Sequence, residues 1–460
     1  MIELSFALYL VVVFGIGVVA HRRTQNFGDY VLGGRSLGPW TAALSAGASD
    51  MSGWLLLGLP GLAYGATGEA IWLALGLLAG TWLNWLWVAP RLRTRSVEAD
   101  DAMTIPAYLA GCFPQRAAAL RMIAALAILV FFVFYTSAGL VGAGKLFATV
   151  FDIDYRVAVV FGIVAVLSYT VLGGFLAVCW TDVLQGLMML IALVLLPVIA
   201  FSAPAEIVAP VDWAAIYRSP ALTTIVSSVA WGLGYFGQPH VLARFKAIRD
   251  VNQVAHSRRI AISWTAFCMI GALAVGVAGR AALGGDLPDP ERVFILLADA
   301  LFHPFIAGLV IAAILAAIMS TADSQLLVCS SVLAEDCYRA LWRRDAQPRE
   351  LLRVGRLAVA LVALVAGLLA LNPDNSVLGL VSYAWAGFGA AFGPVILLSL
   401  YWRGLTADGA LAAVMTGALV VVLWKQLSGG WFELYEIVPA FFAAGSVAIL
   451  VSRIRPGVRA

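Results

Sequence analysis

One short stretch of the chain, residues 45–61 (SAGASDMSGWLLLGLPG), carries residue types that suit ligand binding inside a membrane. Five small or polar residues fall within seven positions of an otherwise apolar run: Gly47, Ser49, Asp50, Ser52 and Gly53. Lipid cannot satisfy backbone N–H and C=O groups, so irregular backbone at membrane depth occurs only where it lines a cavity or is buried in protein. A carboxylate at that depth is costly and indicates function by default. The stretch therefore predicts a binding site within a membrane protein.

A second set of oxygen-bearing residues lies near the end of a later apolar run, in AAIMSTADSQLLVCSS. Ala317, Ser320, Thr321 and Ser324 are spaced i, i+3, i+4, i+7, which places them on one helical face. Hydroxyl and carbonyl oxygens are hard donors that suit a hard cation such as sodium. One helical face offers too few of them, so we expect the irregular backbone at Ala48 and Met51 to supply further carbonyls. The alternative is that the hydroxyls bond back to their own helix or join neighbouring helices.

Two acidic residues flank this face and allow a further cation position. Asp323 lies on the same helix, about 60° round from Ser320, and Asp182 begins another apolar run. Together with Ser320 and Ser324 they could hold a second cation. The alternative is that Asp182 caps the N-terminus of its helix.

The composition supports membrane embedding. Of the 460 residues, 62% are hydrophobic and 12% are charged, and the mean hydropathy is +0.94, whereas soluble domains carry about 25% charged residues. The net charge of +3, without a basic stripe interleaved with aromatic residues, gives no support to nucleic-acid binding. The five cysteines show no ligand spacing and predict no disulfide framework. No nucleophile–base pair is visible, so we do not expect an enzyme.

Hydropathy predicts an all-α protein that crosses the membrane many times. A hydrocarbon core of about 30 Å needs about 20 apolar residues per helix. This rule predicts thirteen spans, at 3–20, 37–64, 68–90, 119–149, 155–174, 180–202, 222–241, 260–280, 303–333, 355–372, 376–401, 407–426 and 434–452. A further amphipathic helix is expected at 288–301, outside the bilayer.

The positions of the basic residues predict the orientation. With the N-terminus outside, the cytoplasmic loops hold 23 of the 29 lysines and arginines (29 − 6). The six on the other side are Lys145, Arg156, Arg218, Arg280, Arg292 and Lys425. The positive-inside rule therefore predicts that the N-terminus is outside and the C-terminus inside. The first span has no basic region before it and carries Glu3, so it is not expected to be a cleaved signal peptide.

A second interrupted span points to internal symmetry. In residues 227–240 (SSVAWGLGYFGQPH), three glycines and Pro239 punctuate Trp231, Tyr235 and Gln238. Five spans separate the two interruptions, as in transporters built from inverted repeats with the site at matching helix breaks. The chain is then a single transport domain over 1–460, with repeats at 37–202 and 203–402, an extra first helix and loop at 1–36, and peripheral helices at 403–460. Glycines that serve only helix packing are the alternative.

Several segments resemble the sodium/solute symporter family and, within it, the sodium/proline symporters. They are SAGASDMSGW, YTSAGL from Tyr135, GGFLAVCWTD, WGLGYFGQPHVLARF and IMSTADSQLLVCSS. The resemblance runs from the first span to the ninth and continues more weakly beyond. It implies a LeuT-like fold of five-helix inverted repeats with extra terminal helices, which agrees with the symmetry above.

The resemblance also implies roles for individual residues. The sodium ligands would be the carbonyls of Ala48, Met51 and Ala317 and the hydroxyls of Ser320 and Thr321, and Asp50 matches an acid important for sodium coupling. A second sodium site known in related sialic-acid transporters maps to Asp182, Ser320, Asp323 and Ser324; Asp323 stands where those have serine. Solute-side positions are Ser52, Gly53, Tyr135, Trp231, Tyr235 and Pro239, to which the aromatic Trp54 and the polar Gln238 add suitable groups.

We therefore expect a sodium-coupled symporter that imports L-proline by alternating access. Its partners would be the solute, Na⁺ and membrane lipid, with a monomeric functional unit in the inner membrane of a prokaryote. One alternative is a sodium symporter for another small solute, such as pantothenate or a different amino acid. Another is a transporter-like membrane sensor, which the absence of a kinase region after the last span disfavours.

Overall fold

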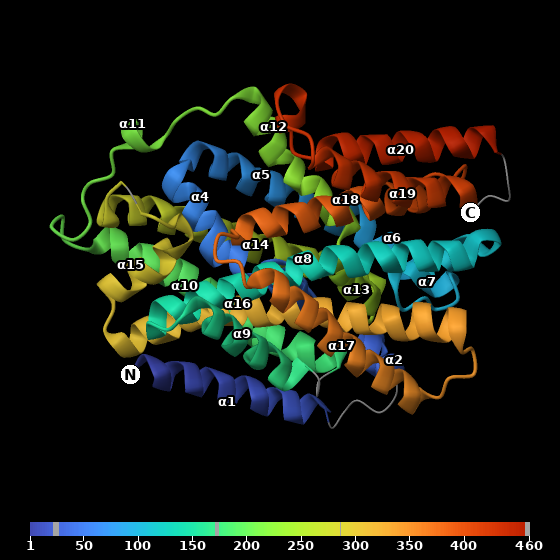
Figure 1. Cartoon of the computed structure of the whole chain (residues 1–460), viewed down its shortest axis with the longest axis horizontal. Coiled ribbons are helices and arrows are strands. Elements are labelled where there is room, and N and C mark those ends of the chain that lie inside the picture. Colours follow the sequence, from blue (N-terminus) through green and yellow to red (C-terminus); the bar gives the residue numbers. More distant parts are fainter. Residues whose placement is uncertain (22–26, 171–173, 286, 456–460) are drawn as a thin grey trace.

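The computed structural model describes residues 1–21, 27–170, 174–285 and 287–455 and is a bundle of long helices. Figure 1 shows most of them running along the longest axis, with α1 beginning at the left-hand end and α20 ending at the right-hand end. The helices are α1 (Ile2–His21), α2 (Phe27–Leu32), α3 (Pro39–Asp50), α4 (Leu59–Gly65), α5 (Thr67–Leu83), α6 (Ala89–Glu98), α7 (Ile105–Cys112), α8 (Ala117–Phe151), α9 (Tyr155–Thr170), α10 (Phe175–Ser202), α11 (Trp213–Ile216), α12 (Leu222–Ala230), α13 (Pro239–Ala247), α14 (Val254–Leu283), α15 (Val293–Leu301), α16 (Pro304–Ser331), α17 (Pro348–Ala370), α18 (Val377–Tyr401), α19 (Ala407–Trp424) and α20 (Ile437–Ile454).

Ten helices of the described part are long and apolar enough to cross a membrane. The three other predicted spans are 37–64 and 222–241, which are each broken in the middle, and 155–174, where α9 has 16 residues. Residues 171–173, at the end of that last span, lie outside the described residues, as do Arg22 and Arg23. The amphipathic helix expected at 288–301 forms as a short turn followed by α15. Ten of the thirteen predicted spans therefore correspond to long apolar helices in the structure.

The break between α3 and α4 releases two carbonyl groups. Met51 leaves the helical conformation at φ −88°, ψ 78°. The N–H of Ser52, which would bond Ala48 in a continuous helix, donates instead to Asp50 O at 3.1 Å, and the N–H of Leu55 donates to Ser52 O rather than to Met51. The carbonyls of Ala48 and Met51 are therefore left without their helical partners.

The break between α12 and α13 has a different form. A 3-10 turn, Trp231–Gly237, follows α12; Gln238 is extended at φ −74°, ψ 108°, and Pro239 begins α13, where its missing N–H costs nothing. Neighbouring helices satisfy the freed carbonyls: Asn84 Nδ2 donates to Tyr235 O at 2.9 Å, and Trp385 Nε1 donates to Trp231 O at 2.7 Å. Both predicted interruptions are confirmed as helix breaks.

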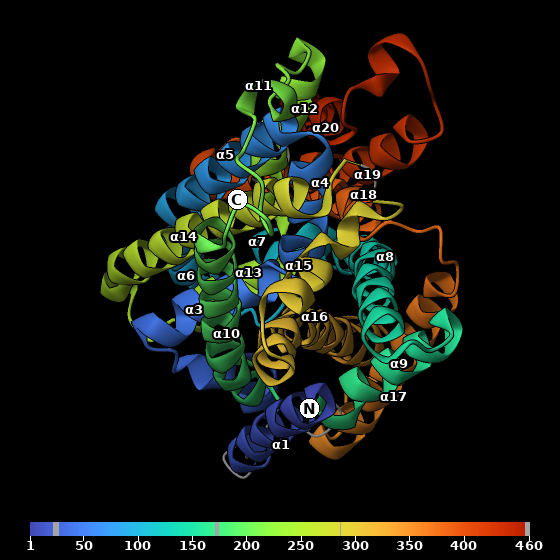
Figure 2. The same ribbon diagram turned by 90° about the vertical axis from the view of Figure 1, so that its left-hand side faces the viewer.

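The core is organised around α16, where 83% of the residues in the most apolar stretch of 18 are buried. Figure 2, viewed from the end at which α1 begins, shows α16 between α1, α8 and α10, and it packs against each of them. The broken helix α3 contacts α10, α14 and α16. An outer helix such as α17 instead exposes leucines at helical spacing, Leu357, Leu361, Leu364 and Leu368, an arrangement that suits contact with lipid.

Candidate functional site

The expected sodium ligands of α3 and α16 come together at the first break. Ser320 Oγ lies 2.8 Å from Ala48 O and 3.0 Å from Ala317 O, and Thr321 Oγ1 lies 3.4 Å from Ala48 O. Oxygen ligands of a hard cation such as calcium lie about 2.3–2.6 Å from it, which puts neighbouring ligands about 3–3.5 Å apart. The three measured oxygen–oxygen distances, 2.8–3.4 Å, are hydrogen-bond distances close to that range. The released carbonyl of Met51 belongs to the same break.

The hydroxyl groups bond both to carbonyls of their own helix and to a carbonyl of a neighbouring helix. Ser320 bonds back to its own helix at Ala317 and also across to Ala48 on α3. Ser324, one turn further along, donates to Ser320 O at 2.8 Å. All of these side chains are buried, so the oxygens are shielded from bulk water. Among the described residues, no group of three or more His, Cys, Asp or Glu side chains gathers elsewhere as a metal cluster.

Asp50 lies two residues beyond Ala48, so its side chain points to the opposite side of α3. Its Oδ1 lies 3.8 Å from Nε2 of His240 on α13. Its backbone oxygen accepts hydrogen bonds from the Tyr135 hydroxyl at 2.9 Å and from Trp54 Nε1 at 3.3 Å. The backbone of Asp50 therefore links the cation position to two aromatic residues on the expected solute side.

The expected solute-binding aromatics meet between the two breaks. The ring centroids of Trp54 and Trp231 are 6.5 Å apart, and Trp231 stacks with Tyr435 at 5.3 Å. Trp385 of α18 contacts Tyr235 edge-on at 5.0 Å. These rings are almost fully buried, since Trp54 is 1% exposed and Trp231 is 6% exposed. Both side chains are thus shielded from bulk solvent.

The remaining expected solute residues do not all face the aromatic cluster. Ser52 accepts a hydrogen bond from Trp54 N at 3.4 Å, and Gly53 packs against Ile318 of α16. Gln238 turns its amide back to Gly234 O at 3.1 Å, within its own 3-10 turn. Pro239 lines a separate small cavity of about 20 Å³ beside Arg244. Pro239 thus faces a different space from the aromatic cluster.

The position expected for a second cation contains the side chain of Arg244. Its Nη2 lies 3.2 Å from Asp182 Oδ2 and also donates to Ser324 Oγ, while its Nε donates to Ser45 Oγ at 3.1 Å. Arg244 and Asp182 are both fully buried. Asp323, one residue before Ser324 on α16, is also fully buried.

Two sequence interpretations are corrected here. Asp182 does not cap a helix, because α10 begins at Phe175, a full two turns earlier. Arg244 was counted among the loop cations, yet it lies on α13 with no exposed surface. A buried carboxylate needs a partner, so Asp182 was the signal that could have pointed to a buried arginine.

Sequence reasoning also missed Trp385, Tyr435 and His240. Trp385 and Tyr435 come from α18 and from the segment just before α20, neither of which carries an interruption or a polar motif. His240 follows the second break directly and was passed over because it belongs to no metal-binding spacing. Aromatic residues are common in membrane helices, so only proximity distinguishes these three.

Comparison with known proteins assigns the family. The model of the sodium:solute symporter family matches residues 30–417. This chain belongs to that family. The sodium/proline symporter of Escherichia coli (strain K12) is 49% identical to this symporter over 97% of this chain and 91% of that protein. The high-affinity proline transporter PutP of Bacillus subtilis (strain 168) is 48% identical over 93% of each chain.

A solved structure shares the fold of this family member. The substrate-bound, outward-open state of a Na⁺-coupled sialic acid symporter matches it with a TM-score of 0.83, covering 99% of this chain and 98% of that chain at 20% identity. The resemblance to sodium/solute symporters is thus confirmed, and the all-helical, multi-pass architecture is that of a symporter of known structure.

Proposed function

We propose that this chain is a sodium-coupled symporter that imports L-proline by alternating access. The observation that carries the proposal is the meeting of the released Ala48 carbonyl with the Ser320 and Thr321 hydroxyls, next to aromatic residues at two helix breaks. The names of the relatives from E. coli and B. subtilis, at 49% and 48% identity, support proline as the solute.

The sodium ligands would be the carbonyls of Ala48, Met51 and Ala317 and the hydroxyls of Ser320 and Thr321. On binding, each hydroxyl would turn its hydrogen away from the carbonyls and present a lone pair to the ion. The ion would then replace the hydrogen bonds that now join α3 to α16, and it would hold the two helices together more strongly than those bonds do.

The solute would lie between the breaks, against Trp54, Trp231 and Tyr235. A pyrrolidine ring suits aromatic faces, and the zwitterion's carboxylate suits exposed N–H groups at a helix N-terminus. Ser52, Gly53, Tyr135 and Gln238 complete the proposed set around the solute, and Pro239, which lines the separate small cavity, would contribute by beginning α13 at the second break. The carbonyl of Asp50 would couple the two ligands, because sodium fixes the break at Ala48 while Asp50 O holds Trp54 and Tyr135.

We further propose that Arg244 takes the place of a second sodium ion. Its guanidinium group already supplies a positive charge to Asp182 and a donor to Ser324. A second ion at Asp182, Ser320, Asp323 and Ser324 would have to displace a buried ion pair. Uptake should therefore depend hyperbolically on sodium concentration, as for one ion per cycle.

At the scale of the chain, we propose thirteen spans with the N-terminus outside and the C-terminus inside, and inverted repeats at 37–202 and 203–402. The 1–36 and 403–460 segments would be peripheral, within one transport domain. A single chain would suffice for transport, surrounded by lipid in the inner membrane of a prokaryote. Each half would contribute one broken helix to the site.

The decisive test is uptake of labelled L-proline into proteoliposomes. An inward sodium gradient should drive accumulation above the external concentration, whereas an inward proton gradient without sodium should not. The control is S331A, on the same helix as the ion ligands but bonded only within it, to Leu327 O at 2.8 Å. Accumulation driven equally by protons alone would contradict the ion assignment.

The nearest alternative is a sodium symporter for another solute. Competition separates the two: unlabelled proline should abolish labelled uptake, while pantothenate and larger amino acids in tenfold excess should leave most of it. If pantothenate competed as well as proline, the solute assignment would be wrong while the sodium site could stand.

A further inference from the structure

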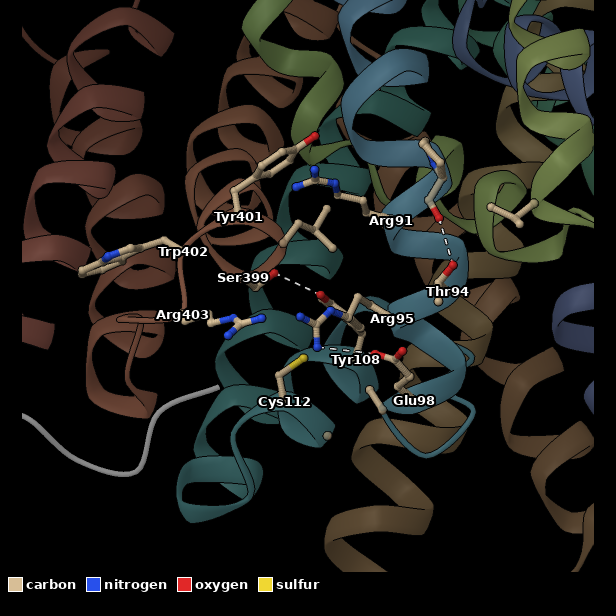
Figure 3. Close-up of a pocket in the computed structure, with 15 residues that line it drawn as sticks. Arg91, Thr94, Arg95, Glu98, Tyr108, Cys112, Ser399, Tyr401, Trp402 and Arg403 are labelled. Atoms are coloured by element: carbon tan, nitrogen blue, oxygen red, sulfur yellow. Dashed lines mark hydrogen bonds and ion pairs between the residues drawn. The ribbon is translucent and has the colours of Figure 1, made fainter.

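A second cavity lies away from the helix breaks, where α6, α7 and the end of α18 meet (Figure 3). Its volume is about 720 Å³, and its walls include Arg91 and Arg95 of α6, Tyr108 of α7 and Arg403 after α18. Figure 3 shows these side chains reaching into one space from three separate elements. We call this cavity the arginine pocket.

The arginine pocket has an excess of positive charge. Three guanidinium groups, from Arg91, Arg95 and Arg403, line it together with one carboxylate, from Glu98, so its net charge is +2 (3 − 1). Glu98 lies 3.4 Å from Arg95. Within the described part of the chain, neither Arg91 nor Arg403 has a carboxylate within ion-pair distance. Two of the three cations thus lack an anionic partner among the described residues.

The three arginines are exposed at the surface, and neighbouring side chains fix the position of one of them. The Arg91 guanidinium lies 3.7 Å above the ring of Tyr401, whose hydroxyl donates to Trp87 O at 3.0 Å. Between α7 and α18, the hydroxyls of Tyr108 and Ser399 are 3.1 Å apart and share a hydrogen bond, and Ser399 Oγ also donates to Ile396 O at 2.8 Å. Guanidinium groups suit the oxygens of a phosphate group.

The location favours a phosphate carried by a lipid. The sequence around α6, with Arg91, Arg93 and Arg95 in five residues, is too charged for the hydrocarbon region. Tyr401 and Trp402 lie at the end of the apolar helix α18, where aromatic residues mark the membrane–water interface. In the orientation proposed above, the loops at this end hold most of the arginines, so this end would face the anionic cytoplasmic leaflet.

We propose that the arginine pocket binds the phosphate group of an anionic phospholipid headgroup, with the acyl chains leaving the pocket toward the hydrocarbon region of the membrane. A soluble nucleotide fits less well, because Arg91 already covers the face of Tyr401 on which a base would stack. Such a lipid would join α6 and α7 to the end of α18 by charge as well as by packing. Basic pockets between membrane helices bind anionic headgroups in this way.

The test uses the delipidated full-length protein in a neutral detergent and follows its thermal unfolding during titration. The probes are short-chain phosphatidylglycerol, short-chain phosphatidylcholine and inorganic phosphate. Phosphatidylglycerol should stabilise the parent protein, and its apparent affinity should be about thirtyfold weaker in R91Q/R403Q, as the loss of two near-surface arginines implies. The matched control R349Q/R353Q removes two exposed arginines of α17 at the same end and should bind like the parent.

Each other outcome overturns the proposal. Equal stabilisation of R91Q/R403Q and parent would place the lipid elsewhere. Equal stabilisation by phosphatidylcholine would show that charge is not recognised. If inorganic phosphate stabilised the parent at the same concentrations as phosphatidylglycerol, and R91Q/R403Q abolished that effect, the pocket would be a site for a soluble anion and the lipid assignment would be wrong.

Discussion

The hydroxyl groups of Ser320 and Thr321 converge on one carbonyl oxygen, that of Ala48, at distances of 2.8 and 3.4 Å. If both hydroxyls are sodium ligands, S320A and T321A should each weaken apparent sodium affinity in proline uptake. A hydrogen bond or contact to a charge is worth about 1.5–3 kcal/mol, which corresponds to about 10–150-fold. Proline affinity at saturating sodium should change less. The control is S331A, because the hydroxyl of Ser331 bonds only within its own helix. Unchanged sodium affinity in S320A and T321A would show that neither hydroxyl binds the ion.

At the scale of the elements, the 3-10 turn between α12 and α13 depends on the absence of a side chain at Gly234. A Cβ there would lie 1.8 Å from Trp385 Nε1, the atom that holds the Trp231 carbonyl. G234A should therefore displace α18 from the break, lower stability by about 1–3 kcal/mol and reduce uptake. The measurement is thermal unfolding of the purified protein alongside proteoliposome uptake. The control is G15A in α1, where a Cβ would meet nothing within 4 Å. G15A should unfold at the same temperature as the parent, whereas G234A should unfold at a lower temperature.

At the scale of the whole molecule, a fully buried ion pair joins the two proposed repeats. Arg244 of α13 meets Asp182 of α10 and Ser45 of α3, so it links 203–402 to 37–202 beneath the site. R244Q leaves the Asp182 carboxylate buried without its cation, and we expect a loss of about 3–5 kcal/mol in the free energy of unfolding. The double variant D182N/R244Q removes both charges and should recover a large part of that loss. Equal stabilities for R244Q and the parent would show that the pair does not hold the halves together.

The sequence by itself determined the class of protein, the two interrupted helices and the helical face that bears Ser320 and Thr321. These follow from local physics: apolar length sets the spans, glycine and proline mark the breaks, and helical periodicity places hydroxyls together. Only the tertiary structure decided which carbonyls meet those hydroxyls, that Asp182 lies two turns inside its helix, and that Arg244 is its partner. The separation of 62 residues between Asp182 and Arg244 leaves no periodic signal. Trp385 and Tyr435 join the site for the same reason, because packing between helices far apart in the chain brings them there and no local pattern encodes it.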